Sequence, residues 1–352
     1  MKSPSARNFW SVKSLIFYFF IIILVVIAAA HFTELESILA ILRNIRPAYL
    51  VLALALQTLT YWANARVYYD LMAIFKIKPL IKVSELFKCS ISSLTINQIM
   101  PSAGVSGNTF VLSYFYRQGI KWRDALKIVI FELATYYGAA LAIFLLLLFY
   151  FTFSFTEKIS GIFYTFIFLG IVIFSLAIAA ILFIGTRRQL PAFLRKVAGW
   201  KPLVSLERRF QTMLTELRLT EEENSGIISW QFLKEKKRRA LAGPLGWQLL
   251  LTLFDSLTIY LLFAGFNVKF SLVYVILGLM ATRVVALFSF IPGALIFFEG
   301  SMIFFYSLLG VPAGMALIVT LLFRFLSFWL PMPAGLFYYK RLSAAGPDTA
   351  DK

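Results

Sequence analysis

The sequence contains very few of the residues on which soluble enzymes and secreted scaffolds depend. Its 352 residues include one cysteine, Cys89, and one histidine, His31. A single cysteine excludes a disulfide within the chain. One cysteine and one histidine together are too few for a zinc site built from several such ligands. Charged residues make up only 14% of the chain, whereas soluble domains average about 25%. These shortages exclude an ordinary soluble enzyme, and we expect no metal site and no cofactor.

Apolar and basic residues, in contrast, are abundant. Hydrophobic residues account for 60% of the chain and aromatic residues for 17%, and a soluble domain has only about 45–50% apolar residues. We therefore expect an all-α, polytopic integral membrane protein. Lysine and arginine number 34 against 17 acidic residues, which gives a net charge of +17. Such an excess is typical of cytoplasmic loops of membrane proteins, so we expect no nucleic-acid partner.

Runs without charge divide the chain into about six full spans, because a helix needs about 20 apolar residues to cross a bilayer. We place these spans at residues 14–33, 47–69, 124–156, 158–186, 244–266 and 312–339. The first run also resembles a secretory signal peptide, but its length favours an uncleaved anchor. The segment that follows it, 33–45, begins with a capping box from Thr33 to Glu36 and predicts an amphipathic helix on the membrane surface.

Two further apolar stretches, 83–117 and 270–309, are interrupted by helix-breaking residues. These residues are Pro101, Gly104 and Gly107 in the first stretch and Pro292 and Gly293 in the second. Two short helices around such a break fit a re-entrant hairpin better than one straight span. The sequence therefore predicts two re-entrant hairpins in addition to the six spans.

We interpret residues 1–352 as a single transmembrane domain in two halves. Its parts are a first half at 1–186, a basic cytoplasmic helical loop at 187–243, a second half at 244–341 and a disordered tail at 342–352. The loop contains a basic cluster, Lys234–Arg239, which is either a plain topology signal or a contact for anionic lipid head groups. Basic residues near both ends of the chain predict cytoplasmic N- and C-termini.

The two broken stretches align without a gap at an offset of 191 residues. The matched pairs are Pro101 with Pro292, Asn108 with Glu299 and Gly119 with Gly310, and upstream Asn64 falls opposite Asp255. One explanation is chance similarity between apolar segments, and the other is an internal repeat. Basic residues flank the first copy, whereas Asn267 and uncharged residues flank the second, which indicates opposite orientations in the membrane. Inverted repeats with broken helices are typical of transporters with a site at the membrane midplane.

Six polar residues within the apolar stretches are candidates for a functional site, because a charge at the centre of a bilayer costs several kcal/mol. They are Asn108, Glu132, Asp255, Arg283, Glu299 and Arg324. One interpretation is a structural ion-pair network that fixes helix packing. The other is a polar groove for a lipid head group or a coupling ion. In that groove the two arginines would bind a phosphate, and Glu299 and Asp255 would face cationic groups or carry protons.

Two segments carry a resemblance to a known family. Residues 99–107, Ile-Met-Pro-Ser-Ala-Gly-Val-Ser-Gly, resemble the first signature of the lysylphosphatidylglycerol synthase transmembrane-region family. The segment Phe290–Gly293, together with Phe298–Gly300, is similar to its second signature. Arg324 and residues 331–335 resemble the family's tail pattern. Many relatives have an acidic residue at the position of Asn108.

The resemblance implies a bacterial or archaeal inner-membrane protein that moves lipids. It does not imply aminoacyl transfer, because we expect the soluble synthase domain of the bifunctional relatives to be absent. We expect a non-enzymatic flippase or exporter of a phospholipid, an aminoacyl-phospholipid, a polyprenyl-linked lipid or a hopanoid. Two alternatives are a membrane-embedded lipid-modifying enzyme with Glu132, Asp255 and Glu299 as its acids, and an accessory subunit of a separate synthase or glycosyltransferase.

Overall fold

The computed structural model describes residues 45–99, 105–154, 159–186, 240–288, 294 and 296–344. Every regular element within these ranges is helical, which confirms the all-α fold class. The chain forms two compact units, Met1–Pro47 and Ala48–Lys352, and the helices below belong to the second apart from the first residue of α3. Residues 1–44, 187–239 and 345–352 lie outside the described residues. The expected anchor, the amphipathic surface helix, and nearly all of the basic loop and the tail are located there.

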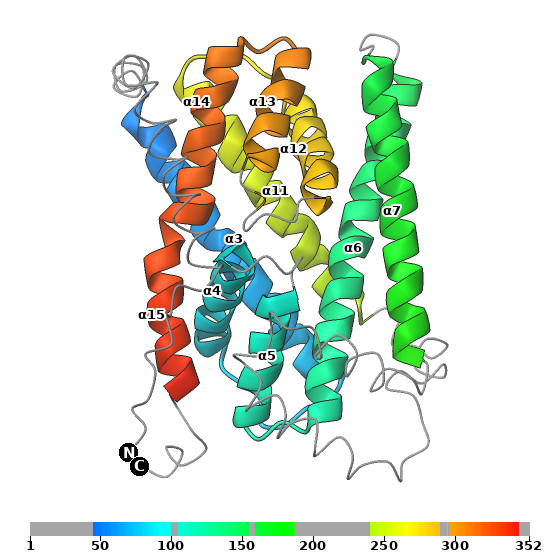
Figure 1. Ribbon diagram of the computed structural model, residues 1–352, viewed down its shortest axis with the longest axis vertical. Helices are drawn as coiled ribbons and strands as arrows, with labels where there is room; N and C mark the ends of the chain where they lie inside the picture. The colour runs from blue at the N-terminus through cyan, green and yellow to red at the C-terminus, as the bar shows by residue number, and fades with distance from the viewer. Residues whose placement is uncertain are drawn as a thin grey trace, which may run out of the picture. The chain divides into compact units, whose positions relative to one another are not determined.

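Ten α-helices lie within the described residues (Figure 1). They are α3 (Pro47–Ile74), α4 (Val83–Ile99), α5 (Val105–Arg117), α6 (Trp122–Phe153), α7 (Gly161–Thr186), α11 (Ala242–Gly265), α12 (Leu272–Leu287), α13 (Phe297–Leu308), α14 (Ala313–Arg324) and α15 (Pro331–Ala344). A π-helical segment, Phe325–Trp329, joins α14 to α15.

Four stretches of the described chain are long and apolar enough to cross a bilayer. They are Trp122–Phe153, Gly161–Phe183, Ala242–Gly265 and Ala313–Ser343. The helices α12 and α13 are also apolar but shorter. The helix α3 has 28 residues and so has sufficient length, but polar side chains along one face make it less apolar than these four.

The helices α4 and α5 pack against each other, and so do α12 and α13. With 17 and 13 residues, α4 and α5 are about 25 and 20 Å long. Neither helix is therefore long enough to cross the hydrocarbon core, which is about 30 Å thick. Figure 1 shows α4 and α5 in the lower half of the view and α12 and α13 in the upper half.

A glycine permits the close approach of the two helices in each pair. Gly107, which the sequence places at the break, instead lies inside α5, and a Cβ atom there would collide with the Ser93 carbonyl oxygen and the Asn97 side chain. Gly278 of α12 has the same role against the ring of Tyr306 in α13. Small residues let helix backbones approach closely. The other expected break residues, Pro101, Gly104, Pro292 and Gly293, lie outside the described residues.

The helix bounds repeat at the offset of 191 residues that the sequence suggests. The helices α3, α4 and α5 correspond to α11, α12 and α13. The helix α6 corresponds to the continuous stretch from α14 to α15. This stretch begins at Ala313 and ends at Ala344, each 191 residues after the corresponding end of α6. The repeat thus extends over four consecutive elements in each half.

The turns between the helices repeat at the same offset. Gly119 and Gly310 have positive φ angles of 79° and 92°, and Lys76 and Asn267 have φ angles of 55° and 59°. The backbone hydrogen bonds that close these turns are also equivalent. They join Ile120 N to Phe115 O at 3.2 Å, Val311 N to Tyr306 O at 3.0 Å, Ile77 N to Met72 O at 2.9 Å and Val268 N to Phe263 O at 3.0 Å. Both halves therefore share one backbone design down to individual turn residues.

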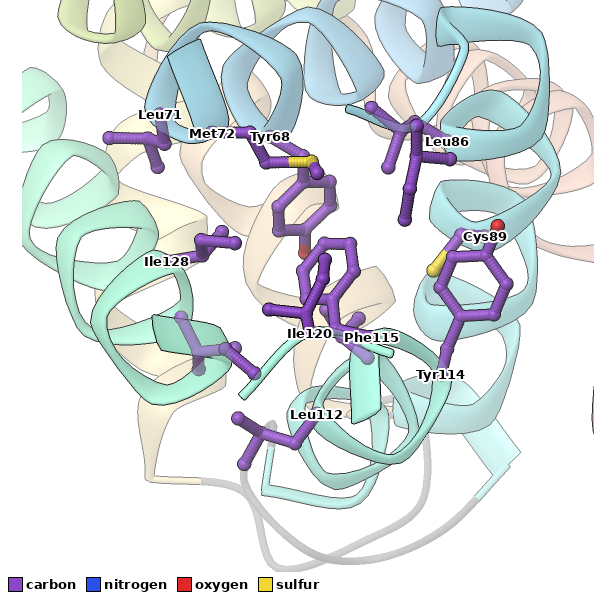
Figure 2. Packing of buried hydrophobic residues seen from close by; sticks show 14 of the residues in the cluster. Tyr68, Leu71, Met72, Leu86, Cys89, Leu112, Tyr114, Phe115, Ile120 and Ile128 are labelled. Carbon is purple, nitrogen blue, oxygen red and sulfur yellow. The ribbon is translucent and has the colours of Figure 1, made fainter. Parts of the chain in front are cut away.

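The helices of the first half share one hydrophobic core, shown in Figure 2. Its labelled residues are Tyr68, Leu71 and Met72 of α3, Leu86 and Cys89 of α4, Leu112, Tyr114 and Phe115 of α5, Ile120 and Ile128. Cys89 is fully buried and behaves as a small apolar residue. A second core, which includes Phe144, Phe163 and Leu277, joins α6, α7 and α12.

The last helix extends further than the sequence predicts. Residues 342–344, which the sequence assigns to the disordered tail, form the end of α15. The reason is a contact with α5, because Arg117 Nη1 donates a hydrogen bond to the carbonyl oxygen of Ser343 at 2.6 Å. A basic side chain at a helix C-terminus satisfies carbonyl groups that have no donor within the helix.

Candidate functional site

A polar cavity of about 380 Å³ is lined by residues from both repeats. Its walls come from α3, α4, α5, α6, α11, α12, α13, α14 and the π-helical segment. Of the six polar residues predicted from the sequence, five line the cavity: Asn108, Glu132, Asp255, Arg283 and Arg324. The sixth, Glu299, is hydrogen-bonded to Arg324. Residues far apart in the sequence therefore meet in one place.

The first ion pair in the cavity joins α11 to α12. Arg283 Nη2 lies 2.6 Å from Asp255 Oδ2, and Arg283 Nη1 donates to Thr252 Oγ1 at 3.0 Å. The other carboxylate oxygen, Asp255 Oδ1, accepts hydrogen bonds from Gln57 Nε2 at 3.1 Å and Thr60 Oγ1 at 3.4 Å. Asp255 is only 8% exposed, so side chains replace water as its hydrogen-bond donors. Its carboxylate ties α3, α11 and α12 together.

The second ion pair joins α13 to α14. Arg324 Nε donates to Glu299 Oε1 at 2.6 Å. The Arg324 guanidinium also lies over two aromatic rings, with its Cζ atom 4.7 Å from the Phe298 centroid and 4.6 Å from the Phe328 centroid. Arg324 is 6% exposed, and aromatic faces stabilise a cation that has lost its water. Three residues of the two ion pairs, Asp255, Arg283 and Arg324, therefore line the polar cavity.

The other carboxylate that lines the cavity, Glu132 of α6, has no basic side chain within ion-pair distance in the part of the chain that the structure describes. Its hydrogen-bond donor is Gln248 of α11, whose Nε2 lies 3.4 Å from Glu132 Oε1. Because Arg283 and Arg324 are each paired with another acid, the three acids and two arginines leave one negative charge uncompensated. In its ionised form, Glu132 carries that charge.

The π-helical segment places a backbone acceptor at the cavity wall. Pro331 has no N–H group, so the carbonyl oxygen of Ser327, four residues earlier, lacks its usual helical donor. That oxygen instead accepts a hydrogen bond from Tyr61 Oη at 3.0 Å and from Gln98 Nε2 at 3.5 Å. Both donors line the cavity. Single π turns within α-helices are often found at functional sites.

The sequence analysis identifies the charged residues of the cavity and Asn108, but it misses most of the other uncharged polar residues. The missed residues are chiefly Gln57, Thr60, Tyr61, Asn64 and Tyr68 on α3, with Gln248 on α11. The five on α3 follow the spacing 0, +3, +4, +7 and +11, which places them on one helix face. A polar stripe along an otherwise apolar helix is the sequence signal that would find them.

A second cavity, of about 580 Å³, is almost wholly apolar. The helices α6, α11 and α12 form it, with exposed side chains such as Leu146, Phe149 and Phe153 along one wall. Thr252 lines this apolar cavity, and its hydroxyl accepts the hydrogen bond from Arg283, which lines the polar cavity. At this point, therefore, a hydrogen bond joins a side chain that lines the apolar cavity to one that lines the polar cavity.

The family model described as lysylphosphatidylglycerol synthase TM region matches residues 12–335 of this chain. The chain belongs to this family. It is therefore a multi-pass membrane protein, in agreement with the long apolar helices. A curated relative from Methanothermobacter thermautotrophicus, described as a UPF0104 membrane protein, is 23% identical over 312 residues, which cover 84% of this chain and 86% of the relative.

In this member of the lysylphosphatidylglycerol synthase transmembrane-region family, the second signature takes part directly in the site. Its Glu299 lies in the first turn of α13 and forms the ion pair with Arg324. Asn108 of α5 occupies the repeat-equivalent position and lines the cavity. An asparagine cannot form the corresponding ion pair, so the two repeats differ in charge at this position.

Proposed function

We propose that this membrane protein is a lipid flippase or exporter that moves its substrate across the plasma membrane of a bacterium or archaeon without changing it chemically. The candidate substrates are a phospholipid, an aminoacyl-phospholipid, a polyprenyl-linked lipid or a hopanoid. The observation that carries the proposal is the hydrogen bond between Thr252, which lines the apolar cavity, and Arg283, which lines the polar cavity. A lipid has a polar head group and an apolar chain, and these two spaces match those two parts.

The charges of the polar cavity favour a charged or zwitterionic head group. Arg283 and Arg324 present planar donor groups that suit phosphate oxygens, and both are held in place by carboxylates. Glu132 supplies a negative charge for a cationic group on the same substrate. The exposed apolar side chains of Leu146 and Phe149 would face the acyl chain beside α6. The lipid could then bind without being deeply buried in the protein over its whole length.

The internal repeat supports transport rather than static binding. In our proposed topology, six full spans and two re-entrant hairpins form two inverted copies, with both termini in the cytoplasm. Lysines 82 and 121 flank the α4–α5 pair, whereas Asn267 and Gly310 flank the α12–α13 pair, so the first pair would open inwards and the second outwards. Inverted repeats around a shared site provide alternating access from either side of the membrane.

The test is a translocation assay with purified protein in proteoliposomes. The vesicles carry a panel of fluorescent lipids that differ in head group, and an impermeant quencher reports how much lipid reaches the outer leaflet. We expect the wild type to move one lipid class selectively, and Arg324→Ala and Glu299→Gln to abolish that movement. Lys127→Ala is the matched control, because Lys127 forms an ion pair with Asp124 that lies outside the cavity and is about one third exposed.

Two outcomes would overturn the proposal. A change in lipid mass during incubation, measured by mass spectrometry, would instead indicate a lipid-modifying enzyme that uses Glu132, Asp255 and Glu299. If no lipid moves and no lipid changes, an accessory role beside a separate synthase or glycosyltransferase becomes the better explanation, and a co-purifying partner would be the next observation to seek. Unchanged movement in Arg324→Ala would remove the assigned role of this arginine.

A further inference from the structure

Two glutamines at repeat-equivalent positions have the same unusual environment. Gln57 of α3 and Gln248 of α11 lie 191 residues apart, and both line the polar cavity. Each donates its amide Nε2 to a carboxylate, Gln57 to Asp255 and Gln248 to Glu132. Because an ionised carboxylate only accepts hydrogen bonds, this contact fixes which amide atom is the nitrogen.

The amide oxygens of these glutamines have no donor among the described residues. Gln57 Oε1 and Gln248 Oε1 are buried and form no hydrogen bond within the part of the chain that the structure describes. Gln57 is only 3% exposed, and Gln248 is only 1% exposed. A buried acceptor with no donor costs free energy, and most buried polar atoms in proteins avoid that state. Two such acceptors at equivalent positions of one cavity therefore indicate a ligand that supplies positive charge or N–H donors.

Glu132 provides the matching charge. It is 9% exposed, and its one hydrogen bond to a described side chain comes from Gln248, which is neutral. Water could satisfy the two amide oxygens, but it would not neutralise an ionised carboxylate at Glu132. We propose that the cavity binds a small monovalent cationic group at Glu132, Gln248 and Gln57, with all contacts made to oxygen atoms.

The donor set favours a monovalent over a divalent cation. Divalent cations such as Ca²⁺ usually take several carboxylates, and Glu132 is the one acid in the cavity that is not already paired with an arginine. Two sources would supply the same chemistry: a free inorganic cation and the ammonium group of a lipid head group. The role of the site in transport rests on the proposed function, whereas cation binding itself does not.

The experiment measures thermal unfolding of the purified full chain in detergent during titration with Na⁺, K⁺ or ammonium. Ionic strength is kept constant with N-methyl-glucamine, which is too large for a site of this kind. A bound ligand raises the unfolding temperature in a saturable manner. We expect at least one small cation to do so, and we expect Glu132→Gln, Gln57→Leu and Gln248→Leu each to raise its apparent dissociation constant by about tenfold or more.

Two control variants separate loss of the site from general damage. Glu85→Gln removes a carboxylate that pairs with Lys88 and is 40% exposed, and Gln118→Leu makes the glutamine exchange at an exposed turn position. Both should leave the cation titration unchanged. A second titration with soluble short-chain phosphatidylethanolamine or phosphatidylglycerol identifies the source. Stabilisation by the amine lipid alone indicates a head group, and stabilisation by the inorganic salts indicates a free ion.

The proposal is overturned if no cation and no amine lipid stabilises the wild type, as would occur if Glu132 were protonated. It is also overturned if Glu132→Gln retains the full effect of the cation. Failure of the proposed function gives a different result. In that case the cation would still stabilise the protein while no lipid moved in the proteoliposome assay.

Discussion

The hydroxyl of Tyr61 in α3 donates a hydrogen bond of 3.0 Å to the backbone carbonyl oxygen of Ser327, which lies 266 residues away in the π-helical segment. This contact depends on Pro331, because a residue with an N–H group at that position would compete for the same oxygen. One proline thus makes a backbone acceptor available to a helix in the other repeat.

The first prediction concerns this contact. Tyr61→Phe should lower the free energy of unfolding by about 0.5–1.5 kcal/mol, since it removes one hydrogen bond between helices. In a Pro331→Ala background the same exchange should cost less, because Ser327 then gains a helical donor. The measurement is a double-mutant cycle from denaturant titrations in detergent. An equal cost in both backgrounds would show that Pro331 does not control the contact.

The second prediction concerns the ion pair between Asp255 and Arg283. Asp255→Asn leaves a buried arginine without its counter-charge and should cost about 3–5 kcal/mol of stability. The double variant Asp255→Asn, Arg283→Gln should cost less than the sum of the single exchanges, because it removes both charges together. Asp124→Asn is the control for a pair that is about one third exposed, and its cost should stay below about 1 kcal/mol. Additive costs at Asp255 and Arg283 would contradict a coupled pair.

The third prediction tests the close approach of α4 and α5. Gly107→Ala should destabilise the protein by about 1–3 kcal/mol, because the added Cβ atom would meet the carbonyl oxygen of Ser93 and the side chain of Asn97. Gly246→Ala in α11 meets no other atom within 4 Å. It should be neutral or stabilising by up to about 1 kcal/mol, because alanine is the better helix former. Thermal unfolding of both variants gives the comparison, and equal behaviour would argue against the contact.

The fourth prediction tests the inverted orientation. Single cysteines replace Lys121 and Asn267 in a Cys89→Ala background, and intact cells are treated with an impermeant thiol reagent. We expect the cysteine at position 267 to react from outside and the one at position 121 to react only after the cells are opened. Cys89 is fully buried, so the wild-type chain should react with neither treatment. Reaction of both introduced cysteines from the same face would refute the inversion.

Much of the fold is predictable from the sequence, because long apolar runs and charged loops fix where helices begin and end. The broken stretch assigned to 83–117 begins at the first residue of α4 and ends at the last residue of α5. The offset of 191 residues emerges from a few matched residues and then recurs in the helix bounds. Charged residues of the cavity are also predictable, since a charge inside an apolar run needs a partner or a polar cavity.

The uncharged part of the site was harder to predict for a physical reason. The free-energy cost of placing a glutamine such as Gln57 or Gln248 inside a bilayer is much lower than that of a charged residue. A glutamine in an apolar helix is therefore a weaker sequence signal of a functional site. The sequence places Gly107 at the break of the hairpin because glycine weakens isolated helices, whereas the structure places it within α5, in close contact with α4. The π turn at Ser327 depends on a proline that also looks like an ordinary helix start.

The helix α7 lies between the two copies of the repeat in the chain. Each repeat has two long helices and one hairpin, so in the proposed topology it starts and finishes on the same side of the membrane. Two such copies joined only by a loop would point in the same direction. In the proposed topology, α7 is the one additional crossing that reverses the second copy. The opposite orientation of the two copies would therefore depend on this helix, and its deletion would turn the second copy over.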